Sequence, residues 1–533
     1  MKSRVQELYP RREKPLRVLS GAICLWIVLA LPVSFVFGLE GTIGTHDPTT
    51  IMLCDGKYYA YGTGGNTHVS DDGWTWERGA AVPGGGGMGP DMIHIGDNYF
   101  MYVAGNVGGQ PASRIVLKTT KSLNPDSPDY GWTEVGPVNT TDGVEFCNGI
   151  DPGCFLDPTT GKFWLTFGSY FGYIRVVELN PKTGMRIDDT YHDIAVNCEA
   201  STMIYHDGYY YLLATHGSCC RGSDSGYNIR VGRSKNVTGP FIDHEGVDMI
   251  QGGGKLLIGS GERYIGAGHF GHINLGNDVE KFSFHWEADL DRGGRSVLAI
   301  RPLLWKDGWP VAGDDFKGGT FEIESEGTGY ALELGVEAVS LAPSRVRQMR
   351  GAPGGPGARG GAGAPRGAGA PGAGAAPRGG RGGFGGFGRG NAGPATPIPD
   401  QDVADVAPNW PEGDLEVRLG DYMLLAHQKW EITPAPDAGG YLGGPYFKIT
   451  IAGTNRTLTK TDDDELIALP AFTGADEQLW RIDQLTDGTY RIMAKVESDR
   501  LGPVALTAVG VTTPSLAKFD PESDRGRWNL KKP

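Results

Sequence analysis

From Gly41 to about Gly313 the chain is a succession of short strand patterns with almost no helical periodicity. The segments "GKYYAYGTG", "DNYFMYVAG", "GKFWLTFGS", "GYYYLLATH" and "FSFHWEADL" are aromatic and apolar, and most are bounded by turn pairs such as Asp-Gly. Such runs are typical of antiparallel strands. Similar segments recur at roughly 40 to 70 residues, which is too long for single hairpins and suits four-stranded blades. The pattern predicts an all-β fold with a β-propeller over 41–316, and a β-sandwich is the alternative.

The overall composition limits the classes of partner. A chain of 533 residues is long enough for two or three domains, and 39% hydrophobic residues can form a sizeable core. The net charge of -14 argues against a general nucleic-acid binder or membrane-surface binder. We therefore expect no binding of nucleic acid and no membrane contact beyond the N-terminal segment. We also expect a monomer, although nothing in the sequence defines the oligomeric state.

The N-terminus is typical of a targeting segment. An uncharged apolar run over 18–38 follows four basic residues, Arg11, Arg12, Lys14 and Arg17. This arrangement predicts a secretory signal over 1–38 with cleavage near Gly38. The run is also long enough for an uncleaved membrane anchor. Either way, we expect the remainder to be secreted or periplasmic.

Seven cysteines occur, and Cys24 lies in the predicted signal. Export permits disulfides, but the spacing of the other six defines no pairing and resembles no zinc site. The adjacent residues Cys219 and Cys220 are not expected to bond to each other.

The C-terminal part contains a threefold repeat. Related segments, "GGTFEI", "GPYFKI" and "DGTYRI", are each followed by a tryptophan strand: "QKWEI", "QLWRI" and "GRWNL". Three such units resemble a ricin-type β-trefoil, which we place at 317–533. We expect Trp430, Trp480 and Trp528 to pack in its core rather than to bind a ligand.

A low-complexity tract over 345–398 interrupts the first of these units. It contains eight arginines between Arg345 and Arg389, no acid in that stretch and few apolar side chains, so we expect it to be disordered. Tracts rich in Arg and Gly can bind single-stranded nucleic acid. In an exported chain we favour a solvated insertion with weak attraction to anionic surfaces.

Three acids occupy similar places in the propeller region. Asp47, Asp151 and Glu199 each precede an apolar or aromatic strand, and Pro48 and Pro152 directly follow the two aspartates. Proline favours an extended backbone in the residue before it, so we expect each acid to start an inner strand and to face the central axis. Two converging carboxyl groups can hydrolyse a glycosidic bond, and a third can raise the pKa of the acid. Taken singly, an Asp-Pro pair indicates only a turn.

Several motifs, in order, resemble glycoside hydrolase family 43, the five-bladed propeller enzymes, and most closely its endo-α-1,5-L-arabinanases. They cover about half of the chain and are "HDP", "NGIDP", "FGSYFGYI", "CEAS", "CCRGSDSGYNIRVGRSKNVTGPF", "GAGHFG" and "RPLLWKDGWPV". The resemblance implies an inverting hydrolase with Asp47 as general base and Glu199 as general acid. It implies that Asp151 raises the pKa of Glu199 and orients its carboxyl group. It implies substrate contacts by His46, Asp91, Asn148, Ser169, Phe171 and Arg221.

The resemblance also implies that His269 faces a metal, usually calcium, in the central channel. Because histidine alone is a poor calcium ligand, waters would have to complete the shell, and a structural histidine is the alternative. The chain departs from the family at Ala267, at "EAS" and at "GMGPD", which ends in Asp91 and lacks the usual aromatic residue. Because of these departures, the resemblance does not define how the sugar stacks in the site, which sugar is bound, or whether the action is endo or exo.

Other functions remain open. The alternative within the same class is an exo-acting arabinofuranosidase or a β-xylosidase. Release of oligomers or of monomer from linear arabinan would distinguish it from an endo-arabinanase. A non-catalytic carbohydrate-binding protein would keep the fold, but the presence of all three acids argues against it. An adhesin or RNA binder that works through the Arg/Gly tract is disfavoured by the acidic remainder. The trefoil either binds polymer or braces the propeller.

Overall fold

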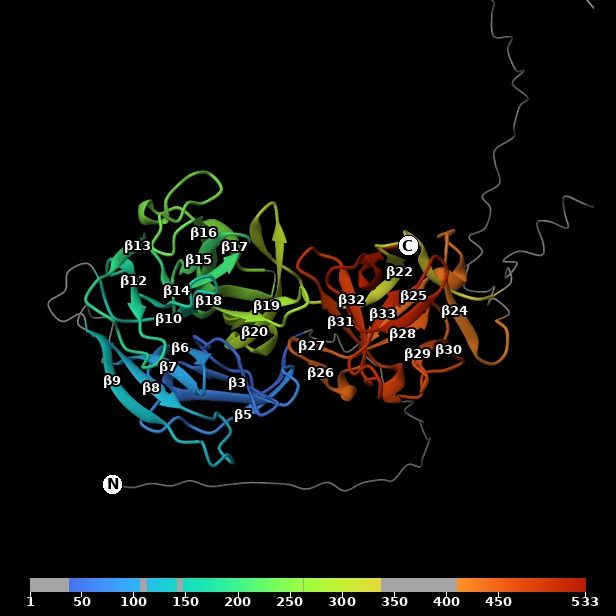
Figure 1. Ribbon diagram of the computed structural model, residues 1–533, viewed down its shortest axis with the longest axis horizontal. Coiled ribbons are helices and arrows are strands. Elements are labelled where there is room, and N and C mark those ends of the chain that lie inside the picture. Colours follow the sequence, from blue (N-terminus) through green and yellow to red (C-terminus); the bar gives the residue numbers. More distant parts are fainter. Residues whose placement is uncertain (1–37, 106–112, 141–146, 262, 337–409) are drawn as a thin grey trace, which may run out of the picture. The chain divides into compact units, whose positions relative to one another are not determined.

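The computed structural model describes residues 38–105, 113–140, 147–261, 263–336 and 410–533 (Figure 1). The predicted signal segment lies outside the described residues except for Gly38, and the tract over 345–398 lies outside them entirely. Within the described ranges every helix is a 3₁₀ turn of three residues, and the remaining elements are strands. None of these helices has the length and apolar character to cross a membrane.

The first part of the chain forms five sheets, each built on four strands consecutive in sequence, and the first sheet has β1 (Glu40–Gly41) as a fifth strand. The first two blades are β2–β5 (Met52–Cys54, Lys57–Gly62, Asn66–Ser70, Thr75–Arg78) and β6–β9 (Met88–Ile95, Asn98–Gly105, Arg114–Thr120, Thr133–Thr140). The third is β10–β13 (Gly153–Leu156, Phe163–Phe167, Tyr173–Leu179, His192–Val196). The last two are β14–β17 (Glu199–His206, Tyr209–His216, Asn228–Ser234, Lys255–Ile258) and β18–β21 (Tyr264–Asn274, Glu280–Asp289, Arg295–Lys306, Trp309–Ala312).

These sheets form the blades of a five-bladed β-propeller, as expected. The first strand of a blade contacts the first strand of the next, as β6 contacts β10 and β10 contacts β14, so the first strands line the axis. Aromatic side chains fill the space between blades: Phe100 and Tyr102 of the second blade pack on Phe163 of the third, with ring centroids 6.3 and 6.0 Å apart. Burial of each such ring contributes about 1.5–3 kcal/mol.

The segment before the first blade closes the ring. The strand β1 (Glu40–Gly41) pairs in parallel with β5. Further along, Leu298 of the last blade donates its amide to the carbonyl of Ile43 at 2.8 Å, and the Ser296 hydroxyl donates to the carbonyl of Thr45 at 2.6 Å. Residues 40–45 thus connect the first blade to the last and lead directly into Asp47.

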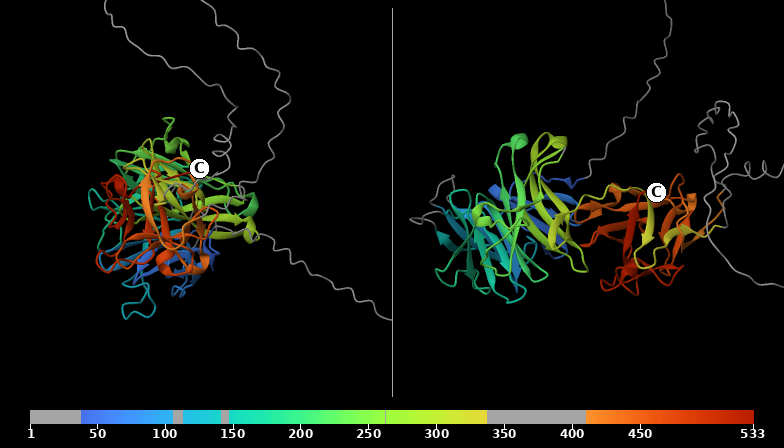
Figure 2. Two further views of the ribbon diagram at one scale, coloured as in Figure 1. Left: turned by 90° about the vertical axis from the view of Figure 1, so that its right-hand side faces the viewer. Right: turned by 90° about the horizontal axis from the view of Figure 1, so that it is seen from above.

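The C-terminal part is a β-trefoil-like body of three four-stranded units (Figure 2). The first unit is β22–β25 (Gly319–Ser325, Ala331–Leu334, Leu415–Gly420, Trp430–Pro434). The second is β28–β31 (Phe447–Ile451, Thr457–Lys460, Leu466–Leu469, Trp480–Gln484), preceded by the hairpin β26–β27 (Gly440–Tyr441, Gly444–Pro445). The third is β32–β35 (Tyr490–Ala494, Ala505–Ala508, Pro514–Ala517, Trp528–Lys531), and β35 pairs with β22 to close the ring.

The three repeated tryptophans are core residues, as predicted. Trp430, Trp480 and Trp528 are fully buried. Their indole N–H groups donate to the carbonyls of Leu332, Leu458 and Leu506 at 2.7, 3.2 and 2.8 Å. Each bond therefore connects the last strand of a unit to its second strand, which explains why tryptophan recurs at that position.

Residues 337–409 interrupt the first trefoil unit. The strands on either side of them, β23 and β24, pair with each other in antiparallel register, with Leu334 opposite Val417. The tract therefore belongs to a connection between neighbouring strands of one unit, as the repeat pattern predicted.

Candidate active site

A residue with a left-handed backbone lies in or just before the inner strand of every blade. These residues are Asp47, Gly89, Asp151, Ala200 and His269, with φ between 47° and 63°. Left-handed backbone costs a non-glycine residue about 1–3 kcal/mol and is concentrated at functional sites. In β6, β14 and β18 the strand register shifts at this point. The extended backbone expected for the two aspartates before proline is wrong, because contacts with other strands, such as the bond from the Asp47 amide to His285 Nδ1, outweigh the preference that proline imposes.

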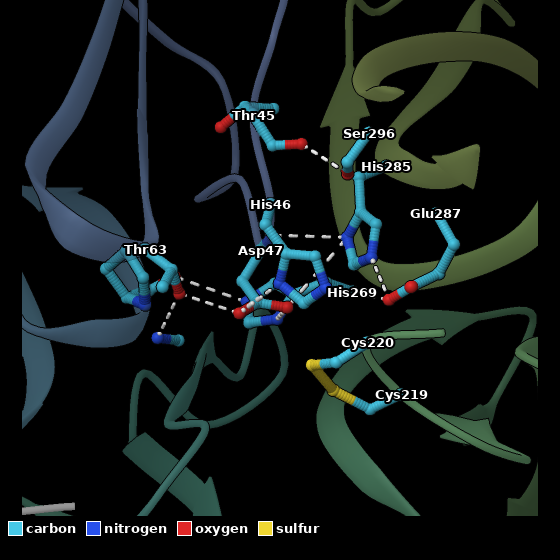
Figure 3. Close-up of polar contacts among 12 residues, drawn as sticks. Thr45, His46, Asp47, Thr63, Cys219, Cys220, His269, His285, Glu287 and Ser296 are labelled. Atoms are coloured by element: carbon cyan, nitrogen blue, oxygen red, sulfur yellow. Dashed lines mark hydrogen bonds and ion pairs between the residues drawn. A yellow bond between two sulfur atoms is a disulfide. The ribbon is translucent and has the colours of Figure 1, made fainter. Parts of the chain in front are cut away.

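Asp47 lies at the centre of a polar network (Figure 3). Thr63 donates its hydroxyl to Asp47 Oδ2 at 2.6 Å, and His46 Nδ1 lies 2.8 Å from the same oxygen. His269 Nδ1 is 3.5 Å from Asp47 Oδ1. Burial alone would raise the pKa of Asp47, but the contacts with His269 and His46 outweigh it and hold the pKa well below its usual range. Asp47 is therefore ionised.

His46 connects Asp47 to a second acid. Its Nε2 lies 2.7 Å from Glu287 Oε1, and His285 Nε2 lies 3.4 Å from the same oxygen. Burial would lower the pKa of His46, yet its bonds to Asp47 and Glu287 raise that pKa to about 10. The charged imidazolium thus lies between two carboxylates and stabilises both ionised forms.

Asp151 is buried and has no basic partner at hydrogen-bonding distance among the described residues. Its carboxyl group accepts the backbone amide of Ala200, the residue after Glu199. Burial is the main reason that the pKa of Asp151 is raised well above its usual range, and the charges of Glu199 and Asp47 add to it. Asp151 therefore acts on Glu199 in two ways: it binds the amide of the next residue, and each carboxylate disfavours ionisation of the other.

Glu199 is the first residue of β14, and its carboxyl group is partly buried. The Tyr227 hydroxyl donates to Glu199 Oε1. Burial raises the pKa of Glu199, the bond from Tyr227 opposes this, and the charge of Asp47 raises it further, so the net shift is upward. The site thus contains one acid held ionised, Asp47, and two acids biased towards protonation, Asp151 and Glu199.

The remaining predicted substrate contacts lie in different surroundings. Asn148 and Ser169 are buried, and Ser169 donates to Asn148 Oδ1 at 3.0 Å. Phe171 is 46% exposed, and Arg221 is also exposed. Asp91 is buried, and both of its oxygens accept backbone amides. Phe171 and Arg221 are therefore free to meet a ligand from solvent, whereas Asp91 supports the site from below its surface.

The protein groups around His269 do not form a calcium-type shell. Its Nε2 lies 3.2 Å from the carbonyl of Pro90, and its Nδ1 faces Asp47. Calcium takes about six to eight oxygen ligands. Among the described residues, the groups with ligand atoms close together centre on His46 instead: with Asp47 and His285, and with Cys219, Cys220 and Glu287. The first set is rich in nitrogen, and the two cysteines of the second form a disulfide and offer no thiolate, so the calcium assignment stays a prediction that these donors do not favour.

Cys219 and Cys220 form a disulfide, contrary to expectation. The left-handed backbone of Cys220, with φ of 62°, brings the two neighbouring side chains to the same side of the chain. The Cys220 amide donates to Glu287, and the sulfur atoms lie beside His46 (Figure 3). Of the other described cysteines, Cys54, Cys147 and Cys198 are buried free thiols, and Cys154 is a partly buried one.

Four site residues escaped the sequence analysis: Thr63, Tyr227, His285 and Glu287. Two of them carried a detectable signal. His285 and Glu287 are two residues apart in an otherwise apolar strand segment, "FSFHWEADL", so they lie on one face of β19. Tyr227 lies within a quoted motif but has no distinguishing neighbour. Thr63 lies in a Gly-rich turn that gives no sign of a catalytic contact.

The chain matches known proteins in both of its parts. Residues 46–310 match "Glycosyl hydrolases family 43" and residues 426–501 match "Ricin-type beta-trefoil lectin domain-like". The "Extracellular exo-alpha-(1->5)-L-arabinofuranosidase ArbA" of Cellvibrio japonicus is 35% identical over 42% of this chain and 68% of its own. The "Extracellular endo-alpha-(1->5)-L-arabinanase 1" of Bacillus subtilis is 31% identical over 50% of this chain and 86% of its own.

Solved structures are also similar to the propeller part. The Cellvibrio cellulosa alpha-L-arabinanase complexed with arabinohexaose is 29% identical, with 51% of this chain and 95% of that chain covered and a TM-score of 0.48. The family match covers the propeller, and the chain covers 68% and 86% of the lengths of the two sequence relatives. Together these matches assign the propeller to the family. The chain is a glycosidase that belongs to glycosyl hydrolase family 43 and carries a ricin-type lectin-like domain at its C-terminal end.

Proposed function

We propose that the protein hydrolyses α-1,5-L-arabinofuranosidic bonds in arabinan with inversion at the anomeric carbon. The observation that carries this proposal is the opposite bias of two acids in one site. The pKa of Asp47 is held low and that of Glu199 is raised, so an ionised base and a protonated acid coexist over a range of pH. We choose arabinan as the substrate because the named relatives act on α-1,5-linked arabinofuranosides.

In the proposed reaction Glu199 donates its proton to the leaving glycosidic oxygen. Asp47 takes a proton from a water molecule, which attacks the anomeric carbon from the opposite face. One C–O bond forms while another breaks, and the proton from Glu199 leaves in the hydroxyl of the released product. After product release Asp47 gives its proton to solvent and Glu199 takes one up, which restores the starting state. No covalent intermediate forms in this sequence.

Asp151 has a supporting role in the proposal. Its contact with the Ala200 amide orients the segment that carries Glu199. Two nearby carboxylates disfavour double ionisation, so an ionised Asp151 disfavours loss of the proton from Glu199, and the reverse holds equally. Asp151 therefore modulates the acid as one member of a coupled pair.

The test is product analysis on debranched linear arabinan beside arabinoxylan and xylan. We expect arabino-oligosaccharides from arabinan, no product from the xylans, and initial release of the inverted anomer by proton NMR. The Asp47→Asn variant serves as the inactive control. Turnover of xylan but not of arabinan, or release of the retained anomer, would contradict the proposal.

An exo mode of action is the second candidate, because one relative is an exo-arabinofuranosidase and another is an endo-arabinanase. Early product sizes distinguish them. An endo enzyme lowers the viscosity of linear arabinan while releasing mixed oligomers. An exo enzyme releases one short product from the start and leaves the viscosity nearly unchanged.

We also propose that the trefoil holds polysaccharide outside the catalytic site, as its lectin-like sequence suggests. The full-length Asp47→Asn variant should stay on insoluble arabinan even when excess soluble arabino-oligosaccharide occupies the catalytic site. Complete release by the oligosaccharide would contradict a second binding site. A location outside the cytoplasm, as for the two relatives named extracellular, completes the proposal.

A further inference from the structure

The second blade has a glycine where the first and third blades carry an acid. Gly89 has the left-handed backbone of Asp47 and Asp151, and like them it is followed by a proline. The five kinked positions thus hold Asp, Gly, Asp, Ala and His in chain order. The blade that lies between the two aspartates contributes no side chain at this position.

The missing side chain leaves space for Asp151. A Cβ atom built on Gly89 would lie 2.0 Å from Asp151 Oδ1, a distance at which one of the two groups must move. The amide of Gly89 also donates to Thr63 Oγ1 at 2.8 Å, and Thr63 in turn donates to Asp47 Oδ2. The backbone of Gly89 therefore touches Asp151 directly and reaches Asp47 through one hydroxyl.

Asp91, two residues further on, connects the same two acids from below. Its Oδ1 accepts the amide of Thr50 at 3.0 Å, and its Oδ2 accepts the amide of Cys154 at 2.8 Å. Thr50 lies three residues after Asp47 and Cys154 lies three residues after Asp151. One carboxylate thus joins equivalent positions of two blades that are otherwise separated by the second blade.

The residue between them adds a third contact. The carbonyl of Pro90 lies 3.2 Å from His269 Nε2, which directs His269 Nδ1 towards Asp47 Oδ1. Asp91 is 5% exposed and His269 is 4% exposed, so these bonds are shielded from competing water. Burial raises the pKa of Asp91, and the amides of Cys154 and Thr50 oppose this shift.

We propose that Gly89-Pro90-Asp91 is the positioning segment of the site: it sets where the carboxyl groups of Asp47 and Asp151 lie relative to each other. The segment supplies no reacting group, and this inference rests on the proposed function only in so far as those acids do the chemistry. A displacement of about 1 Å in a catalytic group can cost about 100-fold in rate.

Two substitutions test the segment in the full-length protein. In Asp91→Asn the side-chain NH₂ group meets one of the two backbone amides, so one bond becomes a contact between two donors. In Gly89→Ala the new methyl group displaces Asp151. We expect kcat on linear arabinan to fall about 10- to 100-fold in each, with KM within about threefold and a fall in melting temperature similar to that of control variants that carry the same kinds of change elsewhere in the propeller. In Gly89→Ala the alkaline limb of the pH profile should also move, because Asp151 is coupled to Glu199.

Matched controls lie elsewhere in the propeller. Asp243 accepts the amides of Glu245, Val247 and Gly254, so Asp243→Asn disturbs a similar carboxylate–amide cluster. Gly184 has a left-handed backbone with φ of 70°, and a Cβ there would lie 2.7 Å from Phe100, so Gly184→Ala adds a similar clash. We expect both to lower the melting temperature and to leave kcat within about twofold.

Crystal structures of the two variants complete the test without relying on turnover. They should show the carboxyl groups of Asp47 and Asp151 displaced relative to each other. Acids that keep their wild-type positions, or variants that lose only stability, overturn the positioning role. A wild-type protein inactive on every arabinofuranoside would contradict the proposed function instead, and the crystal structures would still decide the positioning.

Discussion

The hydroxyl of Tyr227 donates a hydrogen bond to Glu199, the predicted general acid. Tyr227 is itself buried, and burial together with the charge of Glu199 raises its own pKa, so it stays a donor at any working pH. The bond stabilises ionised Glu199 and thereby opposes the burial that keeps this acid protonated. The alkaline side of the activity profile is therefore set by the balance between the two effects.

Substitution Tyr227→Phe should move that balance. Loss of the bond raises the pKa of Glu199, so the alkaline limb of kcat/KM should move to higher pH by up to about one unit, equivalent to about 1.4 kcal/mol. Tyr102→Phe is the matched control, since Tyr102 donates to the carbonyl of Gly184 away from the acids. A limb that stays in place in Tyr227→Phe, or that moves equally in both variants, would contradict this account.

The three acids should differ from other buried acids of the propeller. We expect Asp47→Asn and Glu199→Gln each to lower kcat by roughly 10²–10⁴-fold, and Asp151→Asn also to be severe through a displaced Glu199. Asp157→Asn is the control, because Asp157 is buried and accepts bonds from Thr159, Thr160 and the Tyr210 hydroxyl, none of which contacts the three acids. Circular dichroism should show that all four variants are folded. Near-normal turnover in either of the first two would exclude the assignment.

The imidazolium of His46 should make stability depend on alkaline pH. Its pKa is raised from 6.5 to about 10 in the folded state, so its contribution is fully present below pH 6.5 and is lost as the pH rises through 10. We expect the free energy of unfolding to fall by an amount on the order of 1–4 kcal/mol between pH 7 and 10. Denaturant titrations of wild type and His46→Asn measure it. A difference between the two proteins that does not shrink with pH would contradict the prediction.

Residues 338–408 should be dispensable for the trefoil. Leu334 and Val417 are paired in neighbouring strands, so a short Gly/Ser link can connect the retained ends, and loop closure becomes easier by about 0.6 kcal/mol for each halving of length. We expect a melting temperature that is unchanged or slightly raised and unchanged activity on soluble arabinan. A deletion extended through β23, which removes the fully buried Leu332 and Leu334, is the control that should fail. A marked loss of stability in the short deletion would mean that the tract packs.

The sequence was informative where one residue type repeats and less so where contacts join distant segments. The tryptophans of the trefoil and the acids before apolar strands are visible because the same local need recurs in each unit or blade. Glu287 and Thr63 could not be recognised from the sequence, because their importance depends on contacts with His46 and Asp47, which come from other segments of the chain. The backbone of Asp47 and Asp151 was also mispredicted, because a dipeptide preference cannot reveal contacts with other strands, such as the bond from the Asp47 amide to His285. The Cys219–Cys220 disulfide depended on the same kind of local left-handed backbone.

The pairing of β23 with β24 has a consequence for synthesis of the chain. Leu334 and Val417 are 83 residues apart, by subtraction of their positions. At about 5–20 residues per second, a ribosome needs roughly 4–17 s to reach the partner strand after the first has been made. During that interval the nascent β23 has no neighbour on that edge, and its apolar residues are available to chaperones or to another nascent chain. We therefore expect slower translation of the Gly/Arg/Pro tract to lower the yield of folded protein wherever the chain begins to fold during synthesis.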